Sequence, residues 1–296
     1  MQILVFGAGS LGSLIGGLLA DAHNVTLVGR DPHVSAVREQ GLEITGEIEA
    51  TTDPDADTTV PDSAELAIVT VKSYDTDEAA QALGAADPDV VLSLQNGLGN
   101  EESLSEPLEG TVLAGTCTYG ARLVEPGIVD CTGVGTVTLG ARDGGDSALA
   151  ERTARAFEGT NIDTTVAADM PRRLWEKLAI NAGINAITAL ARVENGALDK
   201  GPVGNVAARA AAETARVARG NGVGLPDERA INKLEAVVET TAPNRSSMYQ
   251  DLQARRRTEI DAINGAVCER ASEPVPINET LTALIETWER GRNLRS

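Results

Sequence analysis

Four polar residues in the stretch RRLWEKLAINAGINAITAL (residues 172–190) have a spacing that suggests chemistry. Lys177, Asn181 and Asn185 are four apart, and Thr188 continues the row, so all four share one face of a helix. The residues around them are mostly apolar, so these polar groups need partners in the protein or a ligand. A lysine in this setting can act as a general acid, with the two amides holding a polar substrate. A network of hydrogen bonds between helices is the alternative.

A second stretch, NRSSMYQDLQARRRTEIDAINGAV (residues 244–267), carries a hydroxyl and a carboxylate that complement the first. Ser247 and Gln250 have the spacing of a capping box, so Ser247 is a candidate N-cap. A hydroxyl at a helix N-terminus is also suited to binding a carboxylate. Glu259 follows the basic run Arg255–Arg257, and an ion pair with that run is its simplest role. Residues 246–271, which begin within this stretch and extend beyond it, have helical spacing and predict a helix.

A glycine-rich turn near the start predicts a dinucleotide site. The apolar run Ile3–Phe6 predicts a strand, a helical pattern covers about Leu11–Ala20, and a second strand is expected at Asn24–Gly29. In this setting GxGxxG provides a tight turn, close approach of the pyrophosphate, and close packing of helix on strand. The free N–H groups of the helix then face the phosphates. A glycine-rich turn in an ordinary α/β protein is the alternative. The residues concerned are Gly7, Ala8, Gly9, Ser10, Leu11 and Gly12.

Two cations near this turn favour NADP over NAD. Arg30 follows the second strand, where its guanidinium can fork onto a 2′-phosphate. Lys72 ends a further strand, expected at Leu66–Lys72, on the same edge. Asp31 offers the opposite interpretation, in which Arg30 is solvated and Asp31 binds the ribose hydroxyls.

Histidine does not supply an obvious proton donor. His23 and His33 are the two histidines of the chain, and both flank the second strand. We expect both to be surface residues of the part that would bind adenosine. Serine-hydrolase and zinc chemistry, which commonly use histidine, are disfavoured for the same reason. The donor must be sought elsewhere, and the stretch that contains Lys177 is the strongest candidate.

The pattern of predicted elements divides the chain in two. Strands and helices alternate through a strand at Asp89–Gly97, which indicates a parallel sheet with helical crossovers. From Val112 the sequence predicts further strands and hairpins, the last at Ile162–Val166, and after Ala168 it is helical. We expect an α/β protein with a Rossmann-type NADP-binding domain at residues 1–168 and an all-α substrate and catalytic domain at 169–296.

Composition excludes several classes of function. The net charge of −19 would repel nucleic acid. No apolar run is long enough to span a membrane, and we expect no signal peptide. Cys117, Cys131 and Cys268 are too few and too scattered for a disulfide framework or a metal cluster, so we expect reduced thiols, no metal and a cytoplasmic location. The even acidity and scarce lysine favour a high-salt cytoplasm, where the charge is screened.

Four blocks of the sequence resemble the ketopantoate reductases (2-dehydropantoate 2-reductases). They are ILVFGAGSLGSLIGGLLA, VKSYDT with LQNGLGNEE, LWEKLAINAGINAITAL, and the stretch 244–267. The resemblance implies a Rossmann domain, a helical domain like that of 6-phosphogluconate dehydrogenase, and an active site between them. It also implies NADPH-dependent reduction of ketopantoate to (R)-pantoate, on the route to pantothenate and coenzyme A.

The resemblance also assigns roles to individual residues. Lys177 matches the family's general acid, and Glu259 matches a glutamate that holds the substrate or that lysine. Arg30 and Lys72 match contacts to the 2′-phosphate. Substrate-side positions are matched by Asn96, which would also lie near the nicotinamide, by Asn181 and Asn185, and by Ser247 at the substrate carboxylate.

Two other functions remain open at this stage. A related reductase of another branched 2-oxo acid would share the lysine and the glycine turn. A non-catalytic nucleotide-binding redox sensor would bind the cofactor without turnover, and it would not need the Lys177 set. We expect a small-molecule substrate, NADPH in preference to NADH, no nucleic-acid or membrane partner, and a monomer or homodimer.

Overall fold

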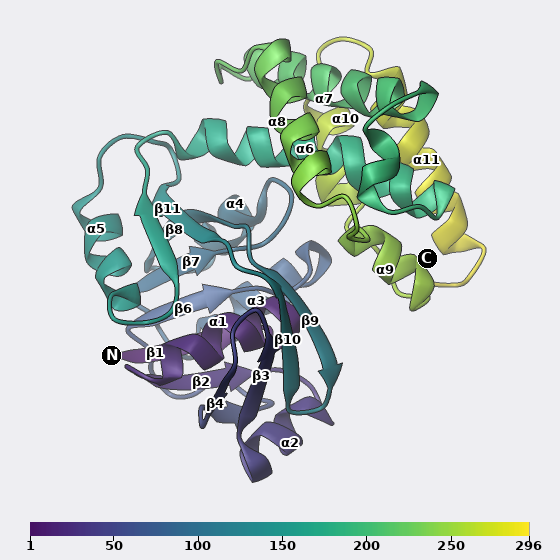
Figure 1. Cartoon of the computed structure of the whole chain (residues 1–296). Helices are drawn as coiled ribbons and strands as arrows, with labels where there is room; N and C mark the ends of the chain where they lie inside the picture. Colours follow the sequence, from purple (N-terminus) through teal and green to yellow (C-terminus); the bar gives the residue numbers. More distant parts are fainter. Residues whose placement is uncertain (296) are drawn as a thin grey trace. The chain divides into compact units, whose positions relative to one another are not determined.

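The computed structural model describes residues 1–295, and the chain divides into two compact units. The first contains residues 1–95 and 100–170, and the second contains residues 96–99 and the chain from Pro171 onward. The short segment Asn96–Gly99 thus belongs to the second unit, although the residues on either side of it belong to the first. Figure 1 shows the strands gathered in the first unit and the long helices in the second.

The first unit is built on an eight-stranded sheet with the order β12-β11-β8-β7-β6-β1-β2-β5. Its strands are β1 (Gln2–Phe6), β2 (Asn24–Val28), β5 (Asp55–Asp57), β6 (Leu66–Val69), β7 (Val90–Ser93), β8 (Thr111–Cys117), β11 (Thr136–Ala141) and β12 (Asp163–Val166). The strands from β8 to β5 run parallel, and β11 is antiparallel to β8. The predicted parallel sheet is confirmed, but β6 and β7 end earlier than expected. Lys72 and Asn96 therefore lie in loops beyond the strand ends.

A second, four-stranded sheet has the order β4-β3-β10-β9. Its strands are β3 (Leu42–Gly46), β4 (Ala50–Thr52), β9 (Gly120–Glu125) and β10 (Ile128–Gly133). The hairpin β9–β10 was expected, whereas β3, β4 and β5 lie where the sequence predicted only a helical spacer. β3 pairs in parallel with β10, so a long-range pairing stabilises short strands whose own sequence is not distinctive.

Helix α1 (Ser10–Ala20) packs between the two sheets (Figure 1). A Cβ on Gly16 would meet Val5 at 3.2 Å and would overlap Leu27, both in the large sheet. A Cβ on Gly17 would instead meet Leu42 at 2.7 Å, in the small sheet. The helix is buried on opposite faces, which explains why its sequence is apolar all round.

Helices cover the remaining surfaces of the large sheet. They are α2 (His33–Gln40), α3 (Thr76–Leu83), α4 (Asn100–Ser105) and α5 (Ala148–Ala154), with 3₁₀ turns η1 (Ser73–Asp75) and η2 (Arg155–Phe157). Successive residues of β1 serve different cores, because Ile3 and Val5 join the α1 side and Leu4 joins the α3 side. This alternation is the expected consequence of the two-residue period of a strand.

His33 is buried, so the expectation of a surface histidine is wrong for this residue. Its Nδ1 accepts the backbone N–H of Gly127 at 3.0 Å, and its Nε2 lies 2.9 Å from Ser13 Oγ. Because a backbone N–H only donates, Nδ1 is unprotonated and Nε2 carries the hydrogen. His33 thereby joins α2 and α1 to the β9–β10 turn, and burial lowers its pKa. His23 is half-buried, with Nε2 2.7 Å from the carbonyl oxygen of Ala156.

Among the described residues of the second unit, every regular element is helical, as predicted. Its elements are α6 (Met170–Ala191), η3 (Asn195–Leu198), α7 (Pro202–Gly220), α8 (Asp227–Thr240), α9 (Ser247–Gln253), the π-helical η4 (Asp261–Gly265), α10 (Ala266–Arg270) and α11 (Pro276–Arg290). The helix expected through residues 246–271 is interrupted. α9 ends at Gln253, and Arg255 has a left-handed φ of 53°. Glu259 lies in the link between α9 and η4.

Two further observations concern residues 1–295. None of their helices combines the length and the apolar character needed to cross a membrane. Cys131 and Cys268 are thiols, and burial raises the pKa of each.

Candidate active site

Close packing within the protein requires two of the three glycines of the motif that follows β1, Gly7 in the turn and Gly12 in α1. Gly7 has a φ of 114°, and a Cβ there would lie 2.7 Å from the backbone nitrogen of Val71. A Cβ on Gly12 would lie 2.5 Å from Thr70 Oγ1 and would overlap the carbonyl oxygen of Gly7. These glycines let the loops after β1 and β6 touch where the strand order reverses, the usual ligand site of such sheets.

Gly9 is different, because the protein leaves space above it. A Cβ there would meet one atom within 4 Å, the Gly7 carbonyl oxygen at 3.9 Å, and its φ of −87° suits any residue. Gly9 is exposed and is the N-cap of α1, where a glycine provides no side-chain cap for the first-turn N–H groups. An open glycine at the start of a buried helix therefore fits a pyrophosphate that approaches the backbone closely.

The neighbouring residues of this turn have structural partners. The backbone N–H of Ala8 donates to Val28 O at 2.8 Å and so joins the turn to β2. Ser10 Oγ accepts the backbone N–H of Leu123, on β9, at 2.9 Å. Leu11 packs against the core between the sheets. The small sheet thus supports the turn from outside, a contact that the sequence did not predict.

The two residues after β2 differ in how their side chains are held. Arg30 is 83% exposed, and its Nη2 lies 3.4 Å from Asp75 Oδ2. Asp31 Oδ1 accepts both the backbone N–H of Ser35, at 3.1 Å, and its hydroxyl, at 2.6 Å. Asp31 therefore serves the first turn of α2. Lys72 is half-buried and directly precedes η1.

In the second unit, the polar row on α6 becomes more buried along the helix. Lys177 and Asn181 are half-buried, Asn185 is 5% exposed, and Thr188 is fully buried. Thr188 Oγ1 bonds Ser246 Oγ at 2.7 Å and lies 2.8 Å from Ile184 O. The network between helices, considered as the alternative for this row, is present at Thr188.

The N-cap of α9 is Ser246, so the interpretation of Ser247 as the cap is wrong by one residue. Ser246 Oγ accepts the backbone N–H of Tyr249 at 3.1 Å. Gln250 Nε2 donates to Arg245 O at 3.0 Å. Ser247 is the first residue of α9 and is exposed. Because Ser246 also bonds Thr188, the start of α9 lies against the row on α6.

Glu259 is buried, with 5% exposure, and is approached by an amide from a distant part of the sequence. Asn96 Nδ2 donates to Glu259 Oε2 at 3.3 Å. The basic run has other carboxylates beside it, since Arg256 pairs with Asp251 at 3.2 Å and Arg257 with Asp261 at 3.3 Å.

Backbone contacts bring this pair to α6. The N–H of Leu98 donates to Ala262 O at 3.2 Å, and a Cβ on Gly97 would lie 2.6 Å from the Ala262 Cβ. Asn264 Nδ2 donates to Ala182 O at 3.1 Å, one residue beyond Asn181. The segment 96–99, the η4 region and the middle of α6 therefore meet within the second unit.

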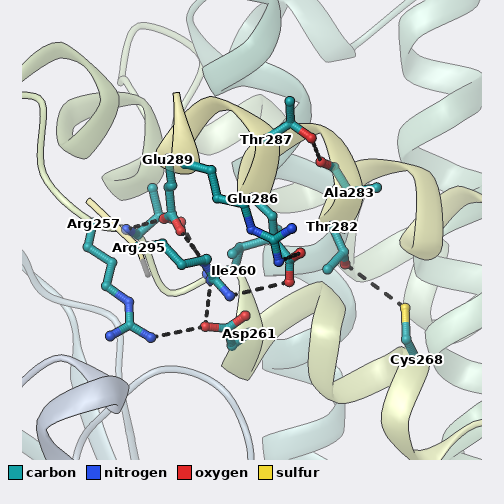
Figure 2. Close-up of polar contacts among 12 residues, drawn as sticks. Arg257, Ile260, Asp261, Cys268, Thr282, Ala283, Glu286, Thr287, Glu289 and Arg295 are labelled. Carbon is teal, nitrogen blue, oxygen red and sulfur yellow. Dashed lines mark hydrogen bonds and ion pairs between the residues drawn. The ribbon is translucent and has the colours of Figure 1, made fainter. Parts of the chain in front are cut away.

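The sequence did not single out a charged network next to Glu259. Figure 2 shows Arg295 between Glu286 and Glu289 of α11 and Asp261 of η4. The pattern of acidic residues in α11 is that of a solvated helix face, so no local signal marks these partners.

Comparison with known proteins identifies the family. The family model described as "Ketopantoate reductase PanE/ApbA" matches residues 3–144, and that of the family's C-terminal part matches residues 169–289. The chain is 44% identical to a 2-dehydropantoate 2-reductase of Halobacterium salinarum, over 98% of this chain and 99% of that protein. It is 38% identical to one from Archaeoglobus fulgidus, over 98% of each.

Solved structures agree over nearly the full length. A PanE/ApbA family ketopantoate reductase from Ralstonia eutropha superposes with a TM-score of 0.89 at 31% identity, over 99% of this chain and 100% of that one. D-mandelate dehydrogenase in a ternary structure with NADH and anilino(oxo)acetate has a TM-score of 0.93 at 26% identity, over all of both chains. The chain belongs to the ketopantoate reductase family.

Proposed function

We propose that this protein is an NADPH-dependent 2-dehydropantoate 2-reductase, which reduces the 2-oxo group of ketopantoate to the hydroxyl of (R)-pantoate. The product is an intermediate in the biosynthesis of pantothenate and coenzyme A. The observation that carries the proposal is the meeting of three segments within the second unit. The Asn96–Glu259 pair is joined by its neighbours to the part of α6 that bears Asn181.

Lys177 is the general acid of this proposal. NADPH, when bound, supplies the hydride that is added to C2. Protonated Lys177 donates a hydrogen bond to the ketone oxygen, stabilises the negative charge that develops there and transfers the proton that completes the alcohol. Asn181 and Asn185 project from the same face of α6 and bind the polar side of the substrate.

Ser247 and Glu259 orient the substrate around that lysine. Ser247 lies in the first turn of α9, where its exposed hydroxyl and the helix N-terminus favour the substrate carboxylate. The Glu259 carboxylate, oriented by Asn96, holds either the substrate or the Lys177 ammonium. Misplacement of these groups would reduce the rate steeply, because reactivity depends on alignment.

The cofactor is bound through the turn after β1. The open face of Gly9 and the first-turn N–H groups of α1 take the pyrophosphate. Arg30 and Lys72 contact the 2′-phosphate. The preference for NADPH over NADH is supported by Asp31, whose carboxylate is already bonded to Ser35.

The test follows the absorbance of the reduced cofactor at high salt. Purified protein receives NADPH or NADH, first with ketopantoate and then with 2-oxoisovalerate. We expect rapid oxidation of NADPH with ketopantoate and slow oxidation with 2-oxoisovalerate or with NADH. If folded protein binds NADPH but does not oxidise it in the presence of any 2-oxo acid, the proposal of a reductase is refuted and a redox sensor is favoured.

A reductase of another 2-oxo acid is the second candidate. It is favoured by the full-length likeness to D-mandelate dehydrogenase, which was solved with NADH and anilino(oxo)acetate. An aromatic 2-oxo acid such as phenylglyoxylate therefore belongs in the same assay. A higher kcat/KM for that compound than for ketopantoate would keep the mechanism and change the substrate.

The proposal also covers the cellular location, the salt concentration and the assembly state of the enzyme. We place the enzyme in the cytoplasm, where cysteine thiols stay reduced, and at high salt, where its net charge of −19 is screened. It acts as a monomer or homodimer on a small-molecule substrate.

A further inference from the structure

A set of charged side chains connects the region after α11 to the residues around Glu259. The chain turns back after α11 at Asn293, which has a φ of 57°, and Leu294 N–H donates to Glu289 O at 3.1 Å. This turn directs the next side chain, Arg295, onto the carboxylates shown in Figure 2. The Arg295 Nε donates to Glu289 Oε2 at 2.8 Å, and its Nη2 donates to Asp261 Oδ2 at 2.6 Å.

Glu289 also binds Thr258, the residue before Glu259. Its side chain is 0% exposed, and its Oε1 accepts both the backbone N–H and the hydroxyl of Thr258, each at 2.7 Å. Thr258 is itself fully buried. The two oxygens of the Glu289 carboxylate thus have different partners. Oε1 accepts hydrogen bonds from Thr258, and Oε2 accepts one from Arg295.

Arg295 acts on the other side of Glu259 as well, because it holds Asp261. Glu259 lies between these two anchored positions, in a link that follows α9 and precedes η4. A regular α-helix would fix this backbone by its own hydrogen bonds, but the link lies outside one. The Glu259 carbonyl oxygen accepts the Ile263 N–H at 3.1 Å, and the charged network adds restraints on the residues at either side.

We infer that Arg295 is a positioning residue for the substrate site, which holds the Thr258–Asp261 segment so that the Glu259 carboxylate keeps its orientation. The inference rests on the proposed function, since it assigns Arg295 an effect through Glu259. Loss of the guanidinium would leave Glu289 buried without this cationic partner, which is strongly destabilising. We expect the Thr258–Asp261 segment to shift in response.

The test compares Arg295→Ala with a matched control, Arg290→Ala. Arg290 is the last residue of α11 and also pairs with Glu286, at 3.3 Å, but within residues 1–295 it forms no hydrogen bond or ion pair with Thr258 or Asp261. We expect Arg295→Ala to lower kcat/KM for the 2-oxo acid by about 10- to 100-fold, as for a small displacement of a catalytic group. Arg290→Ala should match the wild type, and both variants should bind NADPH normally.

Arg295→Lys separates the geometry of the network from its charge. Lysine keeps a positive charge but replaces the planar fork with one ammonium group, which cannot hold Glu289 and Asp261 in the same way. We expect it to recover part of the lost activity. Should Arg295→Ala fail to fold, the lysine variant takes its place in the experiment below.

A double-mutant cycle with Glu259→Gln distinguishes positioning from general stability. If Arg295 acts through Glu259, Arg295→Ala should cost much less in the Glu259→Gln background than in the wild type. Additive effects, or a loss equal to that of Arg290→Ala, would overturn the inference. Wild-type turnover tests the proposed function separately. A folded wild type that reduces no 2-oxo acid would refute that function and this inference with it, whereas an active wild type with an additive cycle would refute the positioning role alone.

Discussion

Replacing Gly9 by alanine should weaken NADPH binding without weakening the fold. The added Cβ would meet the Gly7 carbonyl oxygen at 3.9 Å, an ordinary contact, and the Gly9 φ of −87° suits alanine. A compatible glycine-to-alanine change stabilises a protein by about 0.4–1 kcal/mol, because it restricts the unfolded chain. The free energy of unfolding should therefore stay equal to that of the wild type or rise slightly.

Binding should change in the opposite direction. The methyl group would occupy the space where the pyrophosphate meets the first-turn N–H groups of α1. Loss of one hydrogen bond to a charged group costs about 1.5–3 kcal/mol. That corresponds to an increase in the NADPH dissociation constant of roughly 10- to 150-fold.

Two further glycines make the comparison decisive. Gly12→Ala should lower the free energy of unfolding by about 1–3 kcal/mol, because its Cβ would overlap the Gly7 carbonyl oxygen. Gly133→Ala is the control. Gly133 lies in the same unit, and a Cβ there would meet no atom of another residue within 4 Å, its chain neighbours aside. Fluorescence titration with NADPH and urea unfolding at high salt measure the two quantities. A Gly9→Ala variant that binds NADPH as tightly as the wild type would refute the assignment of this turn to the pyrophosphate.

Other perturbations test the remaining roles. Lys177→Ala should lower kcat for ketopantoate by about 10²–10⁴-fold and leave the affinity for NADPH unchanged. Lys233 is an exposed lysine of the same unit, so Lys233→Ala should leave kcat unaltered. Near-normal turnover in Lys177→Ala would remove Lys177 from the mechanism. Arg30→Ala should raise the dissociation constant of NADPH by about 10- to 100-fold and leave that of NADH unchanged, and an equal effect on both would argue against a 2′-phosphate contact. Because burial lowers the pKa of His33 below its ordinary value of 6.5, its contribution to stability is complete above that pH and is lost as the pH falls through the folded-state pKa. Urea unfolding between pH 7.5 and 5 should therefore show a smaller loss of stability in His33→Gln than in the wild type, and equal losses would contradict this explanation.

Some features of the protein could be predicted from the sequence because they depend on neighbouring residues. The strand, glycine turn and helix at residues 2–20 follow one another directly, and all three are present in the structure. The predicted parallel sheet is also confirmed, and the turn lies where the strand order reverses. The row Lys177–Asn181–Asn185 requires only the helical period, and α6 is a continuous helix over Met170–Ala191. The roles assigned to these residues stay predictions that the variants above address.

Other features depended on tertiary contacts, which local periodicity does not encode. Ser246 rather than Ser247 caps α9, because its hydroxyl also meets Thr188, 58 residues earlier. His33 is buried because a second sheet, formed by segments far apart in sequence, closes over α1 and α2. The helical spacing of residues 246–271 suggested an unbroken helix, yet Thr258 instead bonds Glu289.

The division is clearest at Glu259. The sequence by itself determined that an acidic residue follows a basic run and that the family resemblance gives it a role. Only the fold decided that Asn96, 163 residues away, donates a hydrogen bond to it, and that Arg295 bonds Asp261 and also Glu289, which in turn bonds Thr258. The physical reason is that a helix or a glycine turn is stabilised by interactions between residues that are close in the sequence. A buried carboxylate instead needs hydrogen-bond partners, and these come from whichever segments the packed core brings beside it.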